Sequence, residues 1–167
     1  MENFTWYCAG PWADRPFVRE IIAKIQADGW KTCSRWADSL DIPPDATDRQ
    51  EQLRQRAARD IEDVVQSDGL IYVNSSISEG KSTELGLSIA LLKPIIIIGE
   101  RSYADRGNNN IFLNLNFPCY PTIEDALEWL KGDGQFYLEW VQERQLDHIE
   151  KTLAAFEMAD DVEFPSE

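Results

Sequence analysis

Histidine and cysteine are scarce in this chain of 167 residues. There is one His, at position 148, and the three Cys at positions 8, 33 and 119 follow no recognisable ligand or disulfide spacing. Cys8 and Cys33 fall in predicted strands, so we expect buried free thiols rather than a disulfide. A structural zinc site takes four Cys or His ligands. We therefore expect no zinc site, and the sequence suggests no other cofactor.

Basic residues are few: 16 Lys and Arg stand against 30 Asp and Glu, which gives a net charge of −14. This charge disfavours DNA, RNA and anionic membranes as partners. A small anion is still a possible ligand, because its binding depends on local groups. There is also no signal-peptide pattern and no apolar run of membrane-spanning length, so we expect a cytoplasmic protein.

Apolar residues make up 43% of the chain, which is enough for one globular domain with a sizeable core. Short apolar runs alternate with segments of helical spacing, and the crossovers are long enough for parallel strand pairing. We predict an α/β three-layer sandwich around a sheet of four or five parallel strands. The domain should span residues 1–131, with a helix and acidic tail at 132–167 packed on it. Strands are predicted at 4–9, 31–35, 70–73 and 94–98, and helices at 17–29, 53–65, 85–92, 122–131 and 135–158.

The stretch 75–86 is small, polar and contains glycine, and it lies between the strand 70–73 and the helix 85–92. A strand, a polar loop and a helix start describe the ligand crevice of an open parallel sheet. Glu84 is expected one or two residues inside that helix. It is either a nucleophile whose ionised form the helix end favours, or a residue that only complements the helix dipole.

Other candidates are expected at the same edge of the sheet. Asp60 falls at the margin of the core face of its helix, and the alternative is a solvated Asp in a charged helix. Trp12 and Trp36 follow the first two strands, where they could stack on a planar base or simply pack. Four side chains suited to a phosphate are Arg15, Ser78, Lys81 and Ser82, although each is also ordinary loop chemistry.

Several motifs occur together in the order of a known family. They are Trp6-Tyr7-Cys8-Ala9-Gly10-Pro11, then Asp60-Ile61-Glu62-Asp63 with Ser67-Asp68, then Gly80-Lys81-Ser82-Thr83-Glu84-Leu85-Gly86 through Lys93-Pro94, and more weakly Asn110-Ile111-Phe112 with Leu115. From about residue 4 to 130 the chain resembles the nucleoside 2-deoxyribosyltransferase superfamily, which includes 2'-deoxynucleoside 5'-phosphate N-hydrolases. It is also similar to short bacterial and phage proteins with Arg-Trp after the second strand, here Arg35-Trp36.

The resemblance implies a flavodoxin-like (Rossmann-like) fold and cleavage of an N-glycosidic bond. Glu84 matches the nucleophile of the family, and Asp60 matches an acidic residue near the sugar. Ser78 aligns with a phosphate-contacting Ser of the N-hydrolases, where the transferases tend to carry Asp. Asn110 matches an Asn lent by the neighbouring subunit, which implies a homodimer.

One departure concerns the loop after the first strand. The N-hydrolases carry Gly-Ser-x-Arg there, whereas this chain has Gly10-Pro11-Trp12-Ala13, and Arg15 could take over the phosphate contact. We predict hydrolysis of a (2'-deoxy)nucleoside 5'-monophosphate, with base exchange between nucleosides or a non-catalytic nucleotide sensor as alternatives. The predicted substrate-binding residues are Gly10, Trp12, Arg15, Arg35, Trp36, Ser78, Gly80, Lys81, Ser82 and Asn110.

Overall fold

The sheet has five strands, all parallel, in the order β2-β1-β3-β4-β5. The structure is a computed structural model that describes residues 4–100, 112 and 115–160, without the side chains of 152–160. This strand order is that of the flavodoxin-like fold, so the predicted α/β sandwich is confirmed. The strands are β1 (Thr5–Ala9), β2 (Lys31–Thr32), β3 (Gly69–Val73), β4 (Ile95–Ile98) and β5 (Cys119–Tyr120).

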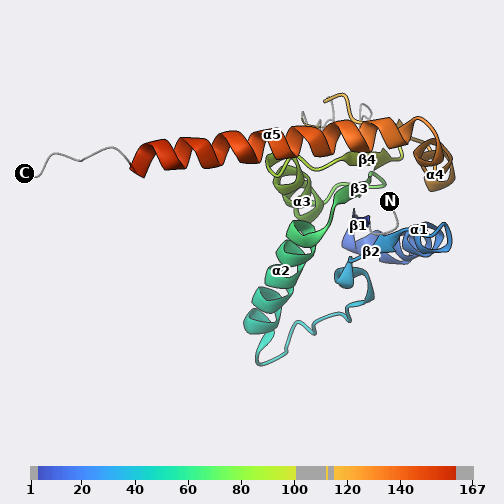
Figure 1. Ribbon diagram of the computed structural model, residues 1–167. Coiled ribbons are helices and arrows are strands. Elements are labelled where there is room, and N and C mark those ends of the chain that lie inside the picture. The colour runs from blue at the N-terminus through green and yellow to red at the C-terminus, as the bar shows by residue number, and fades with distance from the viewer. Residues whose placement is uncertain (1–3, 101–111, 113–114, 161–167) are drawn as a thin grey trace, which may run out of the picture.

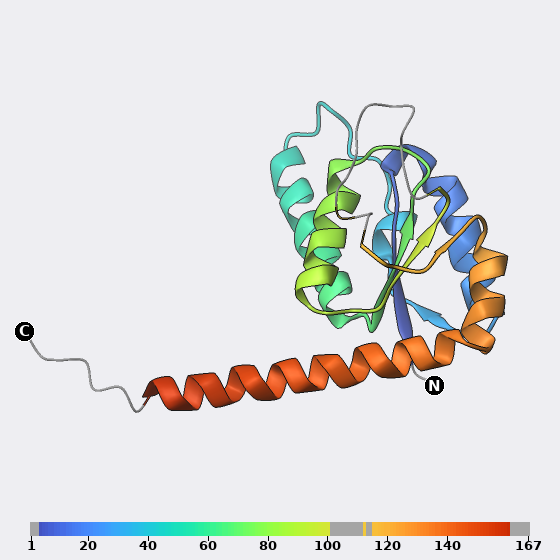
Figure 2. The same ribbon diagram turned by 90° about the horizontal axis from the view of Figure 1, so that it is seen from above.

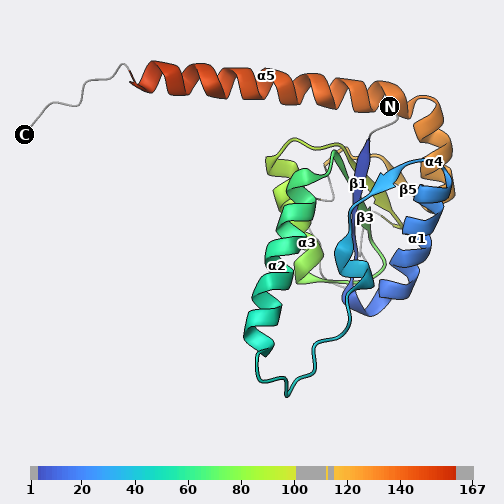
Figure 3. The same ribbon diagram turned by 60° about the horizontal axis from the view of Figure 1, so that its bottom comes forward.

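Helices cover both faces of the sheet. Figure 3 shows α2 and α3 on one face and α1 and α4 on the other, and each pair is also in mutual contact. Two short 3-10 helices, η1 (Trp12–Asp14) and η2 (Arg35–Asp38), follow the first two strands. The α-helices are α1 (Arg15–Ala27), α2 (Arg49–Gln66), α3 (Glu79–Ala90), α4 (Ile123–Lys131) and α5 (Gly134–Asp160).

The central strands are buried along their whole length. Every residue of β3 and β4 is inaccessible or nearly so, as expected for strands covered on both faces. Close packing here depends on Gly69, because a Cβ at this position would lie 2.5 Å from the Trp6 ring. This core holds the carboxyl ends of β1, β3 and β4 in fixed register.

The second strand is shorter than predicted. Instead of continuing to residue 35, β2 ends at Thr32 and the chain turns into η2. The turn is held because the backbone N–H of Arg35 donates to the Cys33 carbonyl at 2.8 Å and to Asp63 Oδ2 at 3.1 Å. Cys33 therefore follows the strand rather than lying in it, whereas Cys8 is buried within β1.

Helix α3 begins earlier than predicted. Ser78 is its N-cap and its side chain accepts from the backbone N–H of Lys81, so the first turn spans the segment that had been expected to be a loop. Glu84 is consequently the sixth residue of α3, not the first or second. The predicted cap at Thr122 is confirmed, with its Oγ1 accepting from the Asp125 N–H at 3.2 Å.

Helix α5 crosses the amino edge of the sheet and then extends well beyond the domain (Figure 1, Figure 2). Its first part packs on the domain through Tyr137, Leu138 and Val141. The Gln145 side chain still donates to the Leu91 carbonyl at 2.8 Å. Within the part of 132–167 that the structure describes, packing on the domain is seen in the first part of α5. Among the described residues, no helix combines the length and apolar character needed to span a membrane.

Candidate active site

A hydrogen bond between Tyr7 and Glu84 lies at the centre of the site. Tyr7 comes from β1 and Glu84 from the second turn of α3, and the Tyr7 hydroxyl donates to Glu84 Oε1 at 2.5 Å. Burial raises the pKa of Glu84 to about 7; the charge of Asp60 adds to the rise, and the bond from Tyr7 opposes it. Burial, followed by the Glu84 charge, raises the pKa of Tyr7, so this phenol stays protonated as a donor.

Asp60, in α2, lies within electrostatic reach of both residues. Burial and then the charge of Asp63 raise the pKa of Asp60 to about 6, against the opposing charges of Arg56, Arg59 and Arg35. The Asp60 charge in turn raises the pKa of Glu84 and of Tyr7. A fully solvated Asp would have neither property, so the structure brings Tyr7, Asp60 and Glu84 into one environment.

Sequence reasoning did not single out Tyr7 as a functional residue. Strand alternation places it on the sheet face opposite to its neighbours Trp6 and Cys8. That pattern was available, but its partner Glu84 is 77 positions away in the chain. A phenol inside a buried strand also reads as ordinary core, so only the packing of α3 on β1 reveals the contact.

Trp36 belongs to the core and offers no ring face to a base. It is 5% exposed, and its Nε1 donates to the Cys8 carbonyl at 2.8 Å. Gly10 is needed for the same packing, because a Cβ there would lie 2.5 Å from Val18 Cγ2. The structure therefore gives Trp36 and Gly10 packing roles where substrate contacts had been predicted.

Trp12 remains accessible, with 38% of its surface exposed, but its ring already has neighbours. The guanidinium of Arg15 lies 4.0 Å and that of Arg56 4.7 Å from the ring centroid. Its Nε1 donates to Asp41 Oδ1 at 2.9 Å. A base that stacked on a ring face covered by one of these cations would have to displace it.

The cations predicted to meet a phosphate are engaged in other contacts. Arg15 donates to the Ser39 carbonyl at 2.6 Å and pairs with Asp41 at 3.4 Å. Arg35 pairs with Asp63 at 2.7 Å and also with Glu62. Both side chains fasten segments around the site, so some of their N–H donors are already used.

Lys81 is buried in the first turn of α3 instead of lying in a loop. Its Nζ donates to the Val73 carbonyl and to Asn74 Oδ1, each at 3.2 Å, and lies 4.6 Å from the centroid of the Tyr72 ring. Burial lowers the pKa of Lys81 to about 8. The ammonium thus joins α3 to the carboxyl end of β3.

The serine hydroxyls near the start of α3 also form hydrogen bonds within the protein. Ser78 caps the helix, and the Ser82 hydroxyl donates to the Ser78 carbonyl at 3.0 Å. Ser75 and Ser76 donate to Asp14 Oδ2 at 2.6 and 3.0 Å. Asp14, which the sequence did not mark as functional, therefore places a carboxylate in front of α3.

Two predicted site residues remain. Gly80 lies in the first turn of α3, where an added Cβ would meet only Ser78 Oγ at 3.8 Å, so the surface there is open. Asn110 lies outside the described residues. In the part of the chain that the structure describes, no group of three His, Cys, Asp or Glu side chains is arranged to hold a metal ion.

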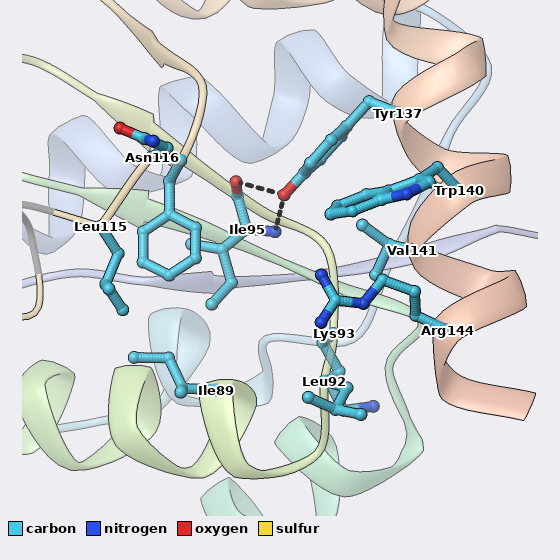
Figure 4. Close-up of a pocket in the computed structure, with 11 residues that line it drawn as sticks. Ile89, Leu92, Lys93, Ile95, Leu115, Asn116, Tyr137, Trp140, Val141 and Arg144 are labelled. Atoms are coloured by element: carbon cyan, nitrogen blue, oxygen red, sulfur yellow. Dashed lines mark hydrogen bonds between the residues drawn. The ribbon is translucent and has the colours of Figure 1, made fainter. Parts of the chain in front are cut away.

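An apolar groove of about 230 Å³ lies at the amino edge of the sheet, where β4 begins (Figure 4). Its floor includes Ile95, the first residue of β4, and its walls come from the end of α3, residues 115–117 and α5. Glu84 and Asp60 are not among its lining residues. The groove is therefore separate from the carboxylate site.

No family model matches the sequence, and no curated protein matches it. Among solved structures, the chain is similar to a 2-deoxyribosyltransferase from the psychrotolerant bacterium Bacillus psychrosaccharolyticus. Sequence identity is 16%, 74% of this chain and 90% of that chain are covered, and the TM-score is 0.51. It is also similar to a CMP N-glycosidase from Clostridium botulinum, at 20% identity, 76% and 98% coverage and a TM-score of 0.47. The chain has the fold of the deoxyribosyltransferase.

Proposed function

We propose that this chain is an enzyme that cleaves the N-glycosidic bond of a (2'-deoxy)nucleoside 5'-monophosphate, with Glu84 as the nucleophile. The observation that carries the proposal is the partly buried hydrogen bond from Tyr7 to Glu84, with Asp60 within electrostatic reach. Carboxyl groups with displaced pKa values at the carboxyl edge of an α/β sheet are typical of catalytic sites. The fold shared with a deoxyribosyltransferase supports the same chemistry.

Cleavage would proceed in two displacements at C1' of the sugar. The Glu84 carboxylate attacks C1' and forms a glycosyl ester, while the base leaves with the bonding electrons and takes a proton from solvent. Water then attacks C1' and gives a proton to a general base of the protein. The ester bond breaks, which restores the Glu84 carboxylate. Asp60 suits the role of that general base, because it lies within electrostatic reach of Glu84 and a pKa of about 6 is close to the pH at which a general base works.

Tyr7 would position the nucleophile. A hydroxyl that donates to Oε1 fixes the rotamer of Glu84 and favours its ionised form, which is the form that attacks. Its bond also withdraws electron density from that oxygen, so we assign the attack to Oε2. The nucleophilic role also explains why a carboxyl lies in the second turn of α3, where the helix dipole gives little support.

A second candidate function is base exchange between nucleosides, and Asp14 favours it. Its carboxylate lies in front of α3 and holds Ser75 and Ser76, where it would repel a 5'-phosphate but could accept a bond from a free 5'-hydroxyl. The expected phosphate ligands Arg15 and Lys81 are engaged elsewhere. The feature that favours a phosphate is the open start of α3 at Gly80, where backbone N–H groups are oriented for an anion.

The decisive experiment is incubation of the purified chain with matched nucleosides and 5'-monophosphates, with and without an acceptor base. Release of free base from monophosphates alone supports the hydrolase, and exchange that requires an acceptor supports the transferase. Binding without turnover would favour the sensor and contradict both enzymes. A 2'-fluorinated substrate adds a mechanistic test, because slow turnover of the ester should leave a covalent adduct on the peptide that contains Glu84.

The resemblance also implies a site completed by Asn110 of a neighbouring subunit. This homodimer stays a prediction. It would be contradicted by full activity at dilutions where the protein is a demonstrated monomer.

A further inference from the structure

Helix α5 has two parts: the first packs on the domain, and the second projects beyond it. The first, residues 134–145, is the root, and it is fastened to the domain. The Ile95 N–H donates to the Tyr137 hydroxyl at 3.0 Å, and that hydroxyl donates to the Ile95 carbonyl at 3.2 Å (Figure 4). Gln145 donates to the Leu91 carbonyl at the end of the root. The root therefore sets the direction in which the rest of α5 leaves the domain.

The second part, residues 146–160, is the arm, and it projects past α3 and α2 (Figure 1, Figure 2). At 1.5 Å per residue the arm is about 22 Å long. A single helix of this length is marginal in water, because most helical stability in proteins comes from packing of an apolar face. Its ion pair between Lys151 and Asp147, at 2.8 Å, is internal to the helix and exposed.

The arm carries an apolar stripe at coiled-coil spacing. Leu146 and Ile149 are 62% and 51% exposed, and in the sequence Leu153 and Phe156 follow at the same spacing. Intervals of three, four and three residues place these four positions alternately at a and d of a heptad repeat. The residues between Leu146 and Leu153, apart from Ile149, are polar or charged, so in this part of the arm the apolar residues lie on one side of the helix.

We propose that the arm binds the same arm of another copy of this chain, as a short parallel coiled coil through this stripe. The charge pattern selects the parallel orientation. Glu143, Glu150 and Glu157 occupy the e positions, and an antiparallel pair would bring these carboxylates together. In a parallel pair they face the g positions, which are Gln145 and Thr152, so no like charges meet.

The stripe lies beside the face of α5 that packs on the domain. At 100° per residue, the centre of the stripe is about 70° around the helix from the midpoint of the root residues Leu138 and Val141, which are buried against the domain. A two-fold axis along the arms would place the two domains on opposite sides of that axis. Leu at a with Ile at d also favours more than two strands, so a dimer or a tetramer of parallel arms fits the sequence.

The test is the mass of the full chain in solution, measured by sedimentation over a range of concentrations. Wild type should sediment as a dimer or tetramer, and the double variant Leu146→Glu/Ile149→Glu should have half that mass or less. Lys151→Glu is the matched control, since it changes the net charge by the same −2 on the same helix but lies outside the stripe. It should keep the wild-type mass. Unchanged near-UV spectra should show that the domain is folded in the wild type and in both variants.

Three results would overturn the proposal: a monomeric wild type, a double variant that keeps the oligomer, or a control that loses it. Orientation has its own test. Ile149→Cys should form an interchain disulfide on mild oxidation, because d positions face each other in a parallel pair. No disulfide from Ile149→Cys in an oligomeric sample would contradict the parallel register. None of these variants changes Glu84, Asp60 or Tyr7, and the readout is mass rather than turnover, so failure of this proposal would not contradict the proposed reaction.

Discussion

The two ends of helix α3 lie at opposite edges of the sheet and are built for different purposes. Its first two turns carry Lys81 and Glu84, whose pKa values are displaced in opposite directions by burial. Its last turn carries Ile89, which lines an apolar groove with Leu92 just beyond the helix and with α5. Displaced titratable groups are typical of reaction sites, and apolar walls are typical of packing. We therefore expect the reaction at the carboxyl edge and a packing role for the amino edge.

The largest expected effect is that of Glu84→Gln. The amide keeps the size and can still accept from Tyr7, but it cannot form the glycosyl ester. Turnover should fall by at least about 10³-fold while substrate binding persists. Trp140→Phe, in the groove at the amino edge, should leave turnover within about twofold. Near wild-type turnover in Glu84→Gln would show that Glu84 is not the nucleophile and has a structural role.

Asp60→Asn should have the second-largest effect. Loss of a positioned acid or base typically costs about 10²–10⁴-fold, and the pH–rate profile should lose its limb near pH 6. Removing the charge of Asp60 should also lower the pKa of Glu84, which would move the remaining limb to lower pH. Glu62→Gln on the same helix is the control, because its carboxylate pairs with Arg35 instead. Equal losses in the two variants would indicate damage to α2 rather than chemistry.

Tyr7→Phe should cost about tenfold and shift the pH profile in the opposite direction. The hydroxyl bond opposes the rise in the pKa of Glu84, so its loss should raise that pKa above about 7 and move the limb to higher pH. Tyr137→Phe is the matched change at the amino edge, where the hydroxyl bonds to Ile95. It should lower the free energy of unfolding by about 1 kcal/mol and leave the pH profile unshifted.

This pair of tyrosines also shows what the sequence could and could not predict. The strands and helices were predictable, because β3 and β4 are apolar runs and α1 and α2 have helical spacing. Glu84 stood out as a carboxyl at the predicted carboxyl edge, and both Glu84 and Asp60 match acidic residues of the family that the chain resembles. Tyr7 did not, because a phenol within an apolar strand gives no sign of a partner on a distant helix.

Errors near α3 have a common physical cause. A polar run such as 75–86 can form either a loop or the first turn of a helix, and the cap at Ser78 decides between them. Starting the helix at Glu79 rotates Lys81 inward to the Val73 carbonyl, which no composition argument indicates. The same ambiguity applies to Trp36, where exposure depends on the turn after β2.

The smallest expected effect is that of Ser78→Asp, and it separates the two readings of Ser78. Asp is as good an N-cap as Ser, so the free energy of unfolding should change by less than about 0.5 kcal/mol. Against a 5'-phosphate the new charge should cost about 1 kcal/mol, seen as a roughly fivefold rise in KM for monophosphates. Nucleosides should be unaffected, or bind better if the 5'-hydroxyl donates to the new carboxylate. Ser78→Ala, which removes the cap, should lower stability by about 1 kcal/mol with a smaller effect on KM. If Ser78→Asp leaves KM for monophosphates unchanged, Ser78 serves the helix alone and any phosphate binds elsewhere along the carboxyl edge.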